Sequence, residues 1–94
     1  LMISSDYLGK LVIIKWIDAK EIESGWHDRS DIIQTVAPEI LSVGWLAERT
    51  NHEIKISADI PTDPEDKESG RSQVIPLGCI KEFNEINCGY VWSL

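Results

Sequence analysis

The stretch Ser72-Gln-Val-Ile-Pro-Leu-Gly-Cys-Ile-Lys-Glu-Phe-Asn-Glu-Ile86 decides the fold of this chain. A short apolar run reaches Pro76, a tight corner follows at 77–79, and a second short element leaves that corner. Two short strands joined in this way are typical of a small β-barrel closing its sheet. The second element is predicted to be a strand from Ile80 to about Asn84. Its apolar residues, spaced by three, also fit one face of a short helix.

Upstream of this corner, residues 40–48 and 53–60 predict a β-hairpin around a tight turn at 50–52. Both segments alternate in hydrophobicity, as a strand with one buried face does. The residues expected to face inward are Leu41, Val43, Trp45 and Ala47 on the first strand and Ile54, Ile56, Ala58 and Ile60 on the second.

Residues 11–19 are rich in β-branched side chains and predict a further strand, apolar on both faces for four residues. The connection that follows is long and predicts a short helix from Arg29 to about Val36. Asp28 is its expected N-cap, and Pro38 limits how far it can extend. The two isoleucines inside this helix are expected to be buried.

The length of 94 residues predicts a single domain. Residues 1–8 are expected to form a loose N-terminal arm, with Met2 as the natural first residue. Residues 61–71 predict a mobile acidic loop that contains two prolines. Residues 87–94 form an apolar tail, which could be a sixth strand or could pair with another chain. Because the tail is hard to place in a barrel already closed by Ile86, we predict that it contacts another copy of the chain.

About five short strands, a long first loop with one short helix, and a strand–corner–strand closure resemble the small barrels of the SH3-like and Sm-like families. The resemblance covers residues 10–86, and Val74 to Ile80 is its most specific part. The chain lacks the acidic-aromatic first-loop pattern of SH3 peptide binders. It also lacks the Asp-x-Asn and Arg-Gly signatures of Sm RNA binders. The resemblance therefore implies a mainly β barrel fold without a ligand.

A second resemblance rests on the cadence of short motifs along the chain. Lys15-Trp-Ile-Asp-Ala19, Ser24-Gly-Trp26, Val43-Gly-Trp-Leu46 and Val74-Ile-Pro76 follow one another as in small proteins encoded by bacteriophages and prophages. This resemblance implies a host-interacting or accessory role and assigns no activity.

The charge balance is acidic, with 16 Asp and Glu against 9 Lys and Arg, for a net charge of −7. Phosphate backbones are bound by clustered basic residues, and here no two basic residues are adjacent, so nucleic-acid binding is not expected. The acidic stretch at 59–68 is interpreted as a solvated loop. A minority hypothesis makes it an imitation of DNA that occupies a nucleic-acid-binding host protein.

The remaining composition predicts a cytoplasmic protein without a membrane segment or a cofactor. The longest apolar run is four residues, and the start of the sequence has no basic-then-apolar leader pattern. Cys79 and Cys88 are interpreted as free thiols. A zinc site would need His27 and His52 as the other ligands, and neither cysteine belongs to a Cys-x-x-Cys pair, so no metal site is predicted.

Candidate binding residues lie in the long first loop and at the end of the hairpin's first strand. Trp26 stands in a polar loop where no strand or helix pattern requires a core residue, whereas Trp16 and Trp45 are expected to fill the core. Trp26 is expected to fold back as a lid over one mouth of the barrel; the alternative is that it stacks on a ligand or meets a partner subunit. Beside Trp26, His27 and Arg29 could contact a ligand, with Arg49 as a further charge partner. No phosphate loop, metalloprotease motif or serine nucleophile motif is present, so catalysis is not expected.

These observations predict a non-enzymatic interaction module that forms a homo-oligomer and could also take a host protein as partner. Tyr90, Val91 and Trp92 are the predicted oligomer contact, because small barrels often pair exposed edges with a second copy. The alternative is a protein that sequesters a small nucleotide-like ligand between subunits, with Trp26 stacking on it.

Overall fold

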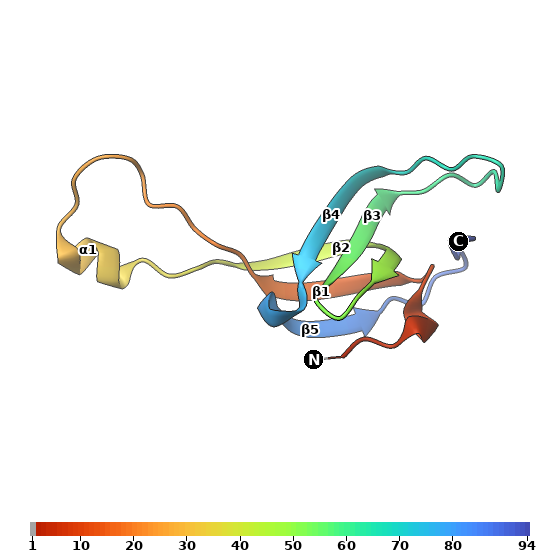
Figure 1. Ribbon diagram of the computed structural model, residues 1–94, viewed down its shortest axis with the longest axis horizontal. Helices are drawn as coiled ribbons and strands as arrows, with labels where there is room; N and C mark the ends of the chain where they lie inside the picture. Colours follow the sequence, from red (N-terminus) through yellow and green to blue (C-terminus); the bar gives the residue numbers. More distant parts are fainter. Residues whose placement is uncertain (1) are drawn as a thin grey trace.

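The computed structural model describes residues 2–94, which form a mainly antiparallel β protein (Figure 1). Within that range, five strands make one sheet in the order β4-β3-β2-β1-β5. The elements in chain order are η1 Ser5–Tyr7, β1 Leu11–Ile17, α1 Arg29–Gln34, β2 Glu39–Arg49, β3 Glu53–Asp59, β4 Gly70–Pro76, η2 Leu77–Cys79 and β5 Ile80–Glu85. The predicted mainly β class, with one short helix in the first long loop, is confirmed.

The sheet is not closed into a barrel within residues 2–94. Strands β1 to β4 pair with their neighbours in sequence, and β5 then lies beside β1. The two outer strands of this order, β4 and β5, are joined directly by the one-turn η2 corner. The predicted corner is therefore present. The element after it is a strand, as predicted, with bounds Ile80–Glu85.

The core lies on one face of this bent sheet and is almost entirely aliphatic. Its buried members are Ile3, Val12, Ile14, Leu46, Ile54, Ile56, Ile75 and Ile80. Trp16 packs against this cluster, and its indole Nε1 donates a 3.0 Å hydrogen bond to Oγ of Ser42 on the neighbouring strand. That bond satisfies the one polar atom that would otherwise make this tryptophan costly to bury.

The inward face of β2 is the opposite of the predicted one. Leu41 and Val43 are exposed, at 64% and 46%, while Ser42, Gly44 and Leu46 face the core. The cause is the register with β1, which sets Ser42 opposite Ile14 and Gly44 opposite Val12. Directly paired residues share a face of the sheet, so the fully buried β1 residues fix which β2 residues lie inside.

Trp45 consequently lies on the outer face and does not fill the core, unlike Trp16. A register shift between Leu46 and Glu48 follows, and it leaves Ala47 as an extra residue on β2. Beyond this bulge, Ile54 and Ile56 on β3 are fully inside, as predicted. The hairpin pairing of β2 with β3 is also confirmed.

The predicted burial of the helix is wrong. Helix α1 ends at Gln34, and Ile32, Ile33 and Val36 are exposed at 48%, 64% and 75%. Asp28 occupies the N-cap position, but its side chain makes no capping hydrogen bond. The physical reason for the exposure is that the helix has no sheet surface beside it.

The helix lies in a projection that we call the β1–β2 arm, residues 18–38, which extends away from the sheet (Figure 1). The molecule measures 54 × 25 × 22 Å, and its radius of gyration is 16.5 Å. A compact chain of this length would have a radius of about 12 Å. The arm is joined at its base by Asp18 N, which donates to Pro38 O at 3.0 Å.

The N-terminal segment is packed on the sheet, although the sequence predicted residues 1–8 to be a loose arm. Ile3 is only 5% exposed, and the ring of Tyr7 packs edge-on against Phe83 of β5 with ring centroids 5.1 Å apart. These two apolar contacts hold the segment against the core. Leu1, which the same prediction included, lies outside the described residues.

Candidate functional site: the β1–β2 arm and the outer sheet face

The tip of the β1–β2 arm carries Trp26 with its side chain wholly in solvent, at 103% relative exposure. The backbone turns there at Gly25, whose φ of 121° lies in a region that residues with a side chain rarely adopt. A tryptophan held outward by such a turn offers a rigid apolar surface at low entropic cost. The expectation that Trp26 folds back as a lid over one barrel mouth is therefore wrong, because the arm carries this residue away from the sheet (Figure 1).

His27 and Arg29 lie beside Trp26 on the arm, and both are exposed. The His27 ring nitrogen Nε2 is 2.5 Å from the backbone oxygen of Glu23, which fixes the ring against the arm. A shallow hollow next to it is lined by Lys20, Glu23, His27, Asp31 and Thr35, among others. Its lining holds three carboxylates, from Glu21, Glu23 and Asp31, and one lysine.

Arg49, the fourth predicted site residue, is not brought near the other three. It ends β2, whereas the arm leads into the start of the same 11-residue strand. At about 3.3 Å per residue, the two ends of β2 are roughly 33 Å apart. Arg49 instead borders a hollow with Met2, Asn51 and Leu77.

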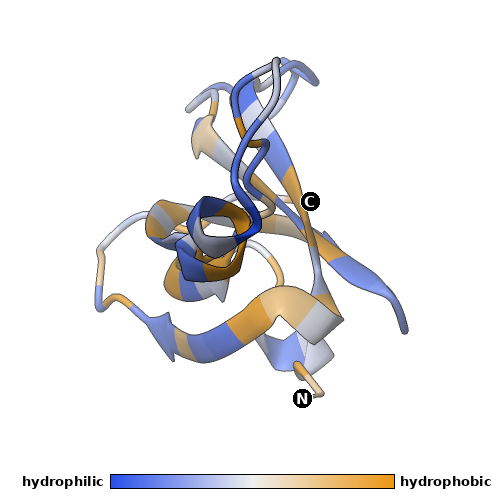
Figure 2. Cartoon of the chain, turned by 90° about the vertical axis from the view of Figure 1, so that its left-hand side faces the viewer, coloured by the Kyte–Doolittle hydropathy of each residue, from blue (hydrophilic) through white to orange (hydrophobic). Residues whose placement is uncertain are grey.

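The outer face of β1 and β2 is an apolar surface that the sequence analysis assigned to the core. Leu41 and Val43 are exposed there, and the register pairs Val43 with the half-buried Ile13. Figure 2 views the molecule from the arm end and shows hydrophobic residues on α1 as well as in the sheet. The arm and this outer face are two separate apolar surfaces, because Glu39 at the start of β2 lies between them and pairs with Lys15 and Lys81.

The tail lies against its own chain at the other end of the molecule (Figure 1). The backbone N of Trp92 donates to Gly9 O at 2.7 Å, and the indole Nε1 of Trp45 donates to Tyr90 O at 3.2 Å. Gly9 has a φ of 82° and lies directly against the Trp92 backbone, so a side chain there would collide with it. Tyr90 and Val91 are exposed, at 68% and 61%.

Among residues 2–94, the shortest ion pair joins the start of β4 to the end of β3. The Arg71 guanidinium donates to both carboxylate oxygens of Asp59, at 2.7 and 2.9 Å. This hydrogen bonding lowers the pKa of the Asp59 carboxyl and raises the pKa of Arg71. Arg71 adopts a positive φ of 50° while making this bidentate contact.

Among residues 2–94, no group of three or more His, Cys, Asp or Glu side chains is arranged to hold a metal ion. Cys79 and Cys88 are free and half-buried. In the same range, no helix has the length and apolar character needed to cross a membrane. Comparisons of the chain with protein-family models, with curated proteins and with solved structures found no match.

Proposed function

We propose that this protein is a non-enzymatic, self-associating interaction module of the phage accessory type, built on an SH3-like or Sm-like framework. The observation that carries the proposal is the β1–β2 arm, which holds Trp26 and the apolar residues of α1 in solvent. Two features support this framework, the strand order and the η2 corner between β4 and β5. If a sheet with this strand order were bent more strongly, its two outer strands would meet and close a barrel.

The arm is energetically unfavourable in an isolated chain. A six-residue helix is far below the length at which helices are stable in water without packing, and α1 leaves Ile32 and Ile33 exposed. Burying one tryptophan removes about 150–250 Å² from water, worth at most about 4–6 kcal/mol at about 25 cal/mol per Å². A partner surface that covers the arm therefore has a large driving force available.

A second copy of the chain fits this requirement. A standard interface takes roughly 20–30 residues from each partner, which is the scale of residues 18–38 plus the outer face of β2. In a two-fold dimer the arm of each copy can lie on the outer sheet face of the other, so that Leu41 and Val43 are covered as well. Each copy carries a net charge of −7, so the contact has to be apolar and should strengthen with added salt.

Sedimentation velocity over a range of protein concentrations tests this proposal. The wild type is expected to associate, and Trp26→Ser is expected to weaken the association by about 2 kcal/mol or more, roughly 30-fold in Kd. The paired variant Tyr90→Ser/Val91→Ser removes exposed apolar area from the tail instead. A wild type that stays monomeric at high micromolar concentration contradicts self-association. If only the tail variant dissociates, the contact between copies lies at the tail and not on the arm.

A second candidate function is binding of a small nucleotide-like ligand between subunits. It is favoured by the fully exposed Trp26 indole, which has a free face for stacking and has Arg29 three residues further along the arm. Arg49 is too distant to take part within one chain. A thermal-shift screen against nucleotides and cyclic nucleotides tests this function, because a ligand that binds only the folded state raises its apparent stability. Trp26→Ala should then abolish the shift, and the absence of any shift rejects the ligand.

A further inference from the structure

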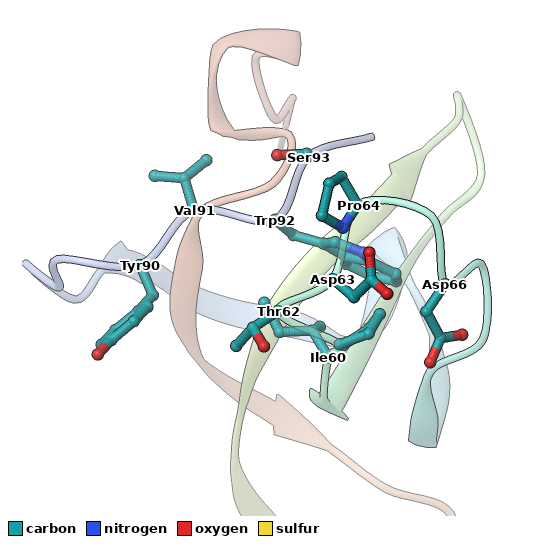
Figure 3. Close-up of a pocket in the computed structure, with 10 residues that line it drawn as sticks. Ile60, Thr62, Asp63, Pro64, Asp66, Tyr90, Val91, Trp92 and Ser93 are labelled. Carbon is teal, nitrogen blue, oxygen red and sulfur yellow. The ribbon is translucent and has the colours of Figure 1, made fainter.

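A groove lies at the opposite end of the molecule from the arm, between the tail and the β3–β4 loop (Figures 1 and 3). The loop side is formed by residues 60–66 and the tail side by residues 90–93. Trp92 is half-buried, and Figure 3 shows its indole extending beneath Asp63 and Pro64. The groove encloses about 220 Å³, which is room for one long side chain.

The tail is held in this position by its own chain. Its backbone is fixed by the hydrogen bonds from Trp92 N to Gly9 O and from the Trp45 indole to Tyr90 O. Because Gly9 allows the tail to approach closely, the Trp92 ring is placed beside the loop without any contribution from a partner. The groove is therefore formed before anything binds in it.

The polar lining of the groove is acidic. Asp63 and Asp66 contribute carboxylates, and the described residues that line the groove include no basic side chain. Oδ1 of Asp63 accepts from Glu65 N, and Oδ1 of Asp66 accepts from Glu68 N, each at 2.9 Å. The second oxygen of each carboxylate takes no hydrogen bond from residues 2–94, so both remain available to a ligand.

The basic residues closest in sequence form no ion pair with these two carboxylates. Arg71 is paired with Asp59, and Lys67 donates to the backbone oxygen of Pro64 at 2.9 Å. The apolar walls are Trp92 and two proline rings, which suit an aliphatic chain. An aromatic face together with carboxylates attracts a cation, and a guanidinium stacks on an aromatic ring especially well.

We propose that this groove binds an arginine or lysine side chain from a basic segment of a partner protein. The aliphatic part of that side chain lies between Pro61 and Pro64, and its charged head lies between the Trp92 ring and the carboxylates of Asp63 and Asp66. The partner differs in composition from this chain, whose nine basic residues are scattered with no two adjacent. The proposal concerns the end of the molecule away from the arm and does not depend on self-association.

The test is isothermal titration calorimetry with an acetylated, amidated five-arginine peptide at low salt. Asp63→Asn/Asp66→Asn removes both charges, while each asparagine oxygen can still accept the backbone hydrogen bond that orders the loop. The matched control Glu48→Gln/Glu82→Gln removes the same charge from exposed positions on β2 and β5, outside both the groove and the arm. We expect the groove variant to weaken binding at least about tenfold, the effect of losing one charge-assisted hydrogen bond. The control should change affinity less than about twofold, since distant exposed charges are screened.

A substitution in the tail tests the aromatic contribution. Trp92→Leu should weaken peptide binding several-fold. If this variant unfolds, Trp92→Tyr keeps an aromatic ring in place and should cause a smaller loss of affinity. Equal losses in the groove variant and the control variant would overturn the proposal, because the peptide would then respond to net charge alone. It is also overturned if no peptide binds, or if spermidine binds as tightly as the peptide. Sedimentation of the groove variants reports self-association separately, so failure of one proposal is distinguishable from failure of the other.

Discussion

Replacing Gly44 with alanine tests the closest approach of two strands in the sheet. A Cβ atom at this position would lie 3.0 Å from the backbone oxygen of Ser57 and 3.2 Å from Cβ of Ile56. Both neighbours belong to β3, which is paired on its two sides with β2 and β4. Neither atom is the end of a flexible side chain, so the strands themselves have to separate by a few tenths of an ångström.

The expected cost is that of overpacking a well-packed core, about 1–3 kcal/mol of unfolding free energy. For a domain of this size, each kcal/mol lowers Tm by roughly 4–8 °C. The measurement is urea denaturation of Gly44→Ala and the wild type, with the slope m compared to check that the unfolded states are alike. The midpoint should fall while m stays the same.

Two other glycines serve as matched controls for the Gly44 variant. A Cβ atom added at Gly78 would have no neighbour within 4 Å, and the φ of Gly78 is not positive, so Gly78→Ala should be neutral or stabilising by up to about 1 kcal/mol. Gly25 is equally open but has a φ of 121°, so Gly25→Ala should destabilise the arm through backbone strain alone. A Gly44→Ala protein within about 0.5 kcal/mol of the wild type would refute the close-approach argument.

Three further predictions follow from the core, the outer face and the surface ion pair. Leu46→Ala should cost about 2–5 kcal/mol because Leu46 is fully buried, whereas Leu41→Ala should cost less than about 1 kcal/mol in the monomer, as thermal denaturation will measure. Trp16→Phe removes the indole hydrogen bond to the buried serine on β2 and should cost about 1 kcal/mol by urea denaturation. Because Arg71 lowers the pKa of Asp59 in the folded state, that pair stabilises the fold above about pH 4 and loses its effect as pH falls through the folded pKa. The difference in denaturation midpoint between wild type and Asp59→Asn should therefore be present at pH 7 and disappear towards pH 2; a difference that grows on acidification would contradict it.

The sequence was sufficient to predict those strands in which one face is apolar and the other is polar. On β3, Ile54 and Ile56 alternate with polar residues, so one face had to be buried and the hairpin with β2 could be predicted. The corner after Pro76 was also predictable, because Gly78 and the short flanking strands allow little else. Residues 80–85 fitted a helix equally well by spacing, and pairing with β1 decided for the strand.

The inward face of β2 could not be predicted from hydrophobicity. Leu41 and Val43 alternate as core residues would, but the buried positions between them hold Ser42 and Gly44. The register with β1 turns both positions inward; the Trp16 indole hydrogen bond satisfies the buried Ser42 hydroxyl, and the close approach of β3 leaves no room for a side chain at Gly44. Both reasons depend on partners that lie far away in sequence.

The candidate site was predictable only in part, for a related reason. The polar context of Trp26 indicated correctly that it lies outside the core, whereas the apolar residues of α1 suggested burial that this chain does not provide. The groove at Trp92 depends on the contact of the tail with Gly9, which no local pattern reveals. Sequence spacing also could not show that Arg49 and Trp26 lie near opposite ends of β2.

The errors about burial include two exposed apolar surfaces, the outer face of β2 and helix α1 of the arm. Leu41 and Val43 on β2 and the apolar residues of α1 were all assigned to a core, and all of them are exposed in the single chain. Natural sequences are locally consistent with their folds, and an exposed apolar patch on a small protein is typical of an interaction site. When a hydrophobic pattern predicts burial at residues that the single chain leaves exposed, the pattern supports burial of those residues in an assembly. It supports the proposal, made from the geometry of the arm, that these residues are covered when two copies meet.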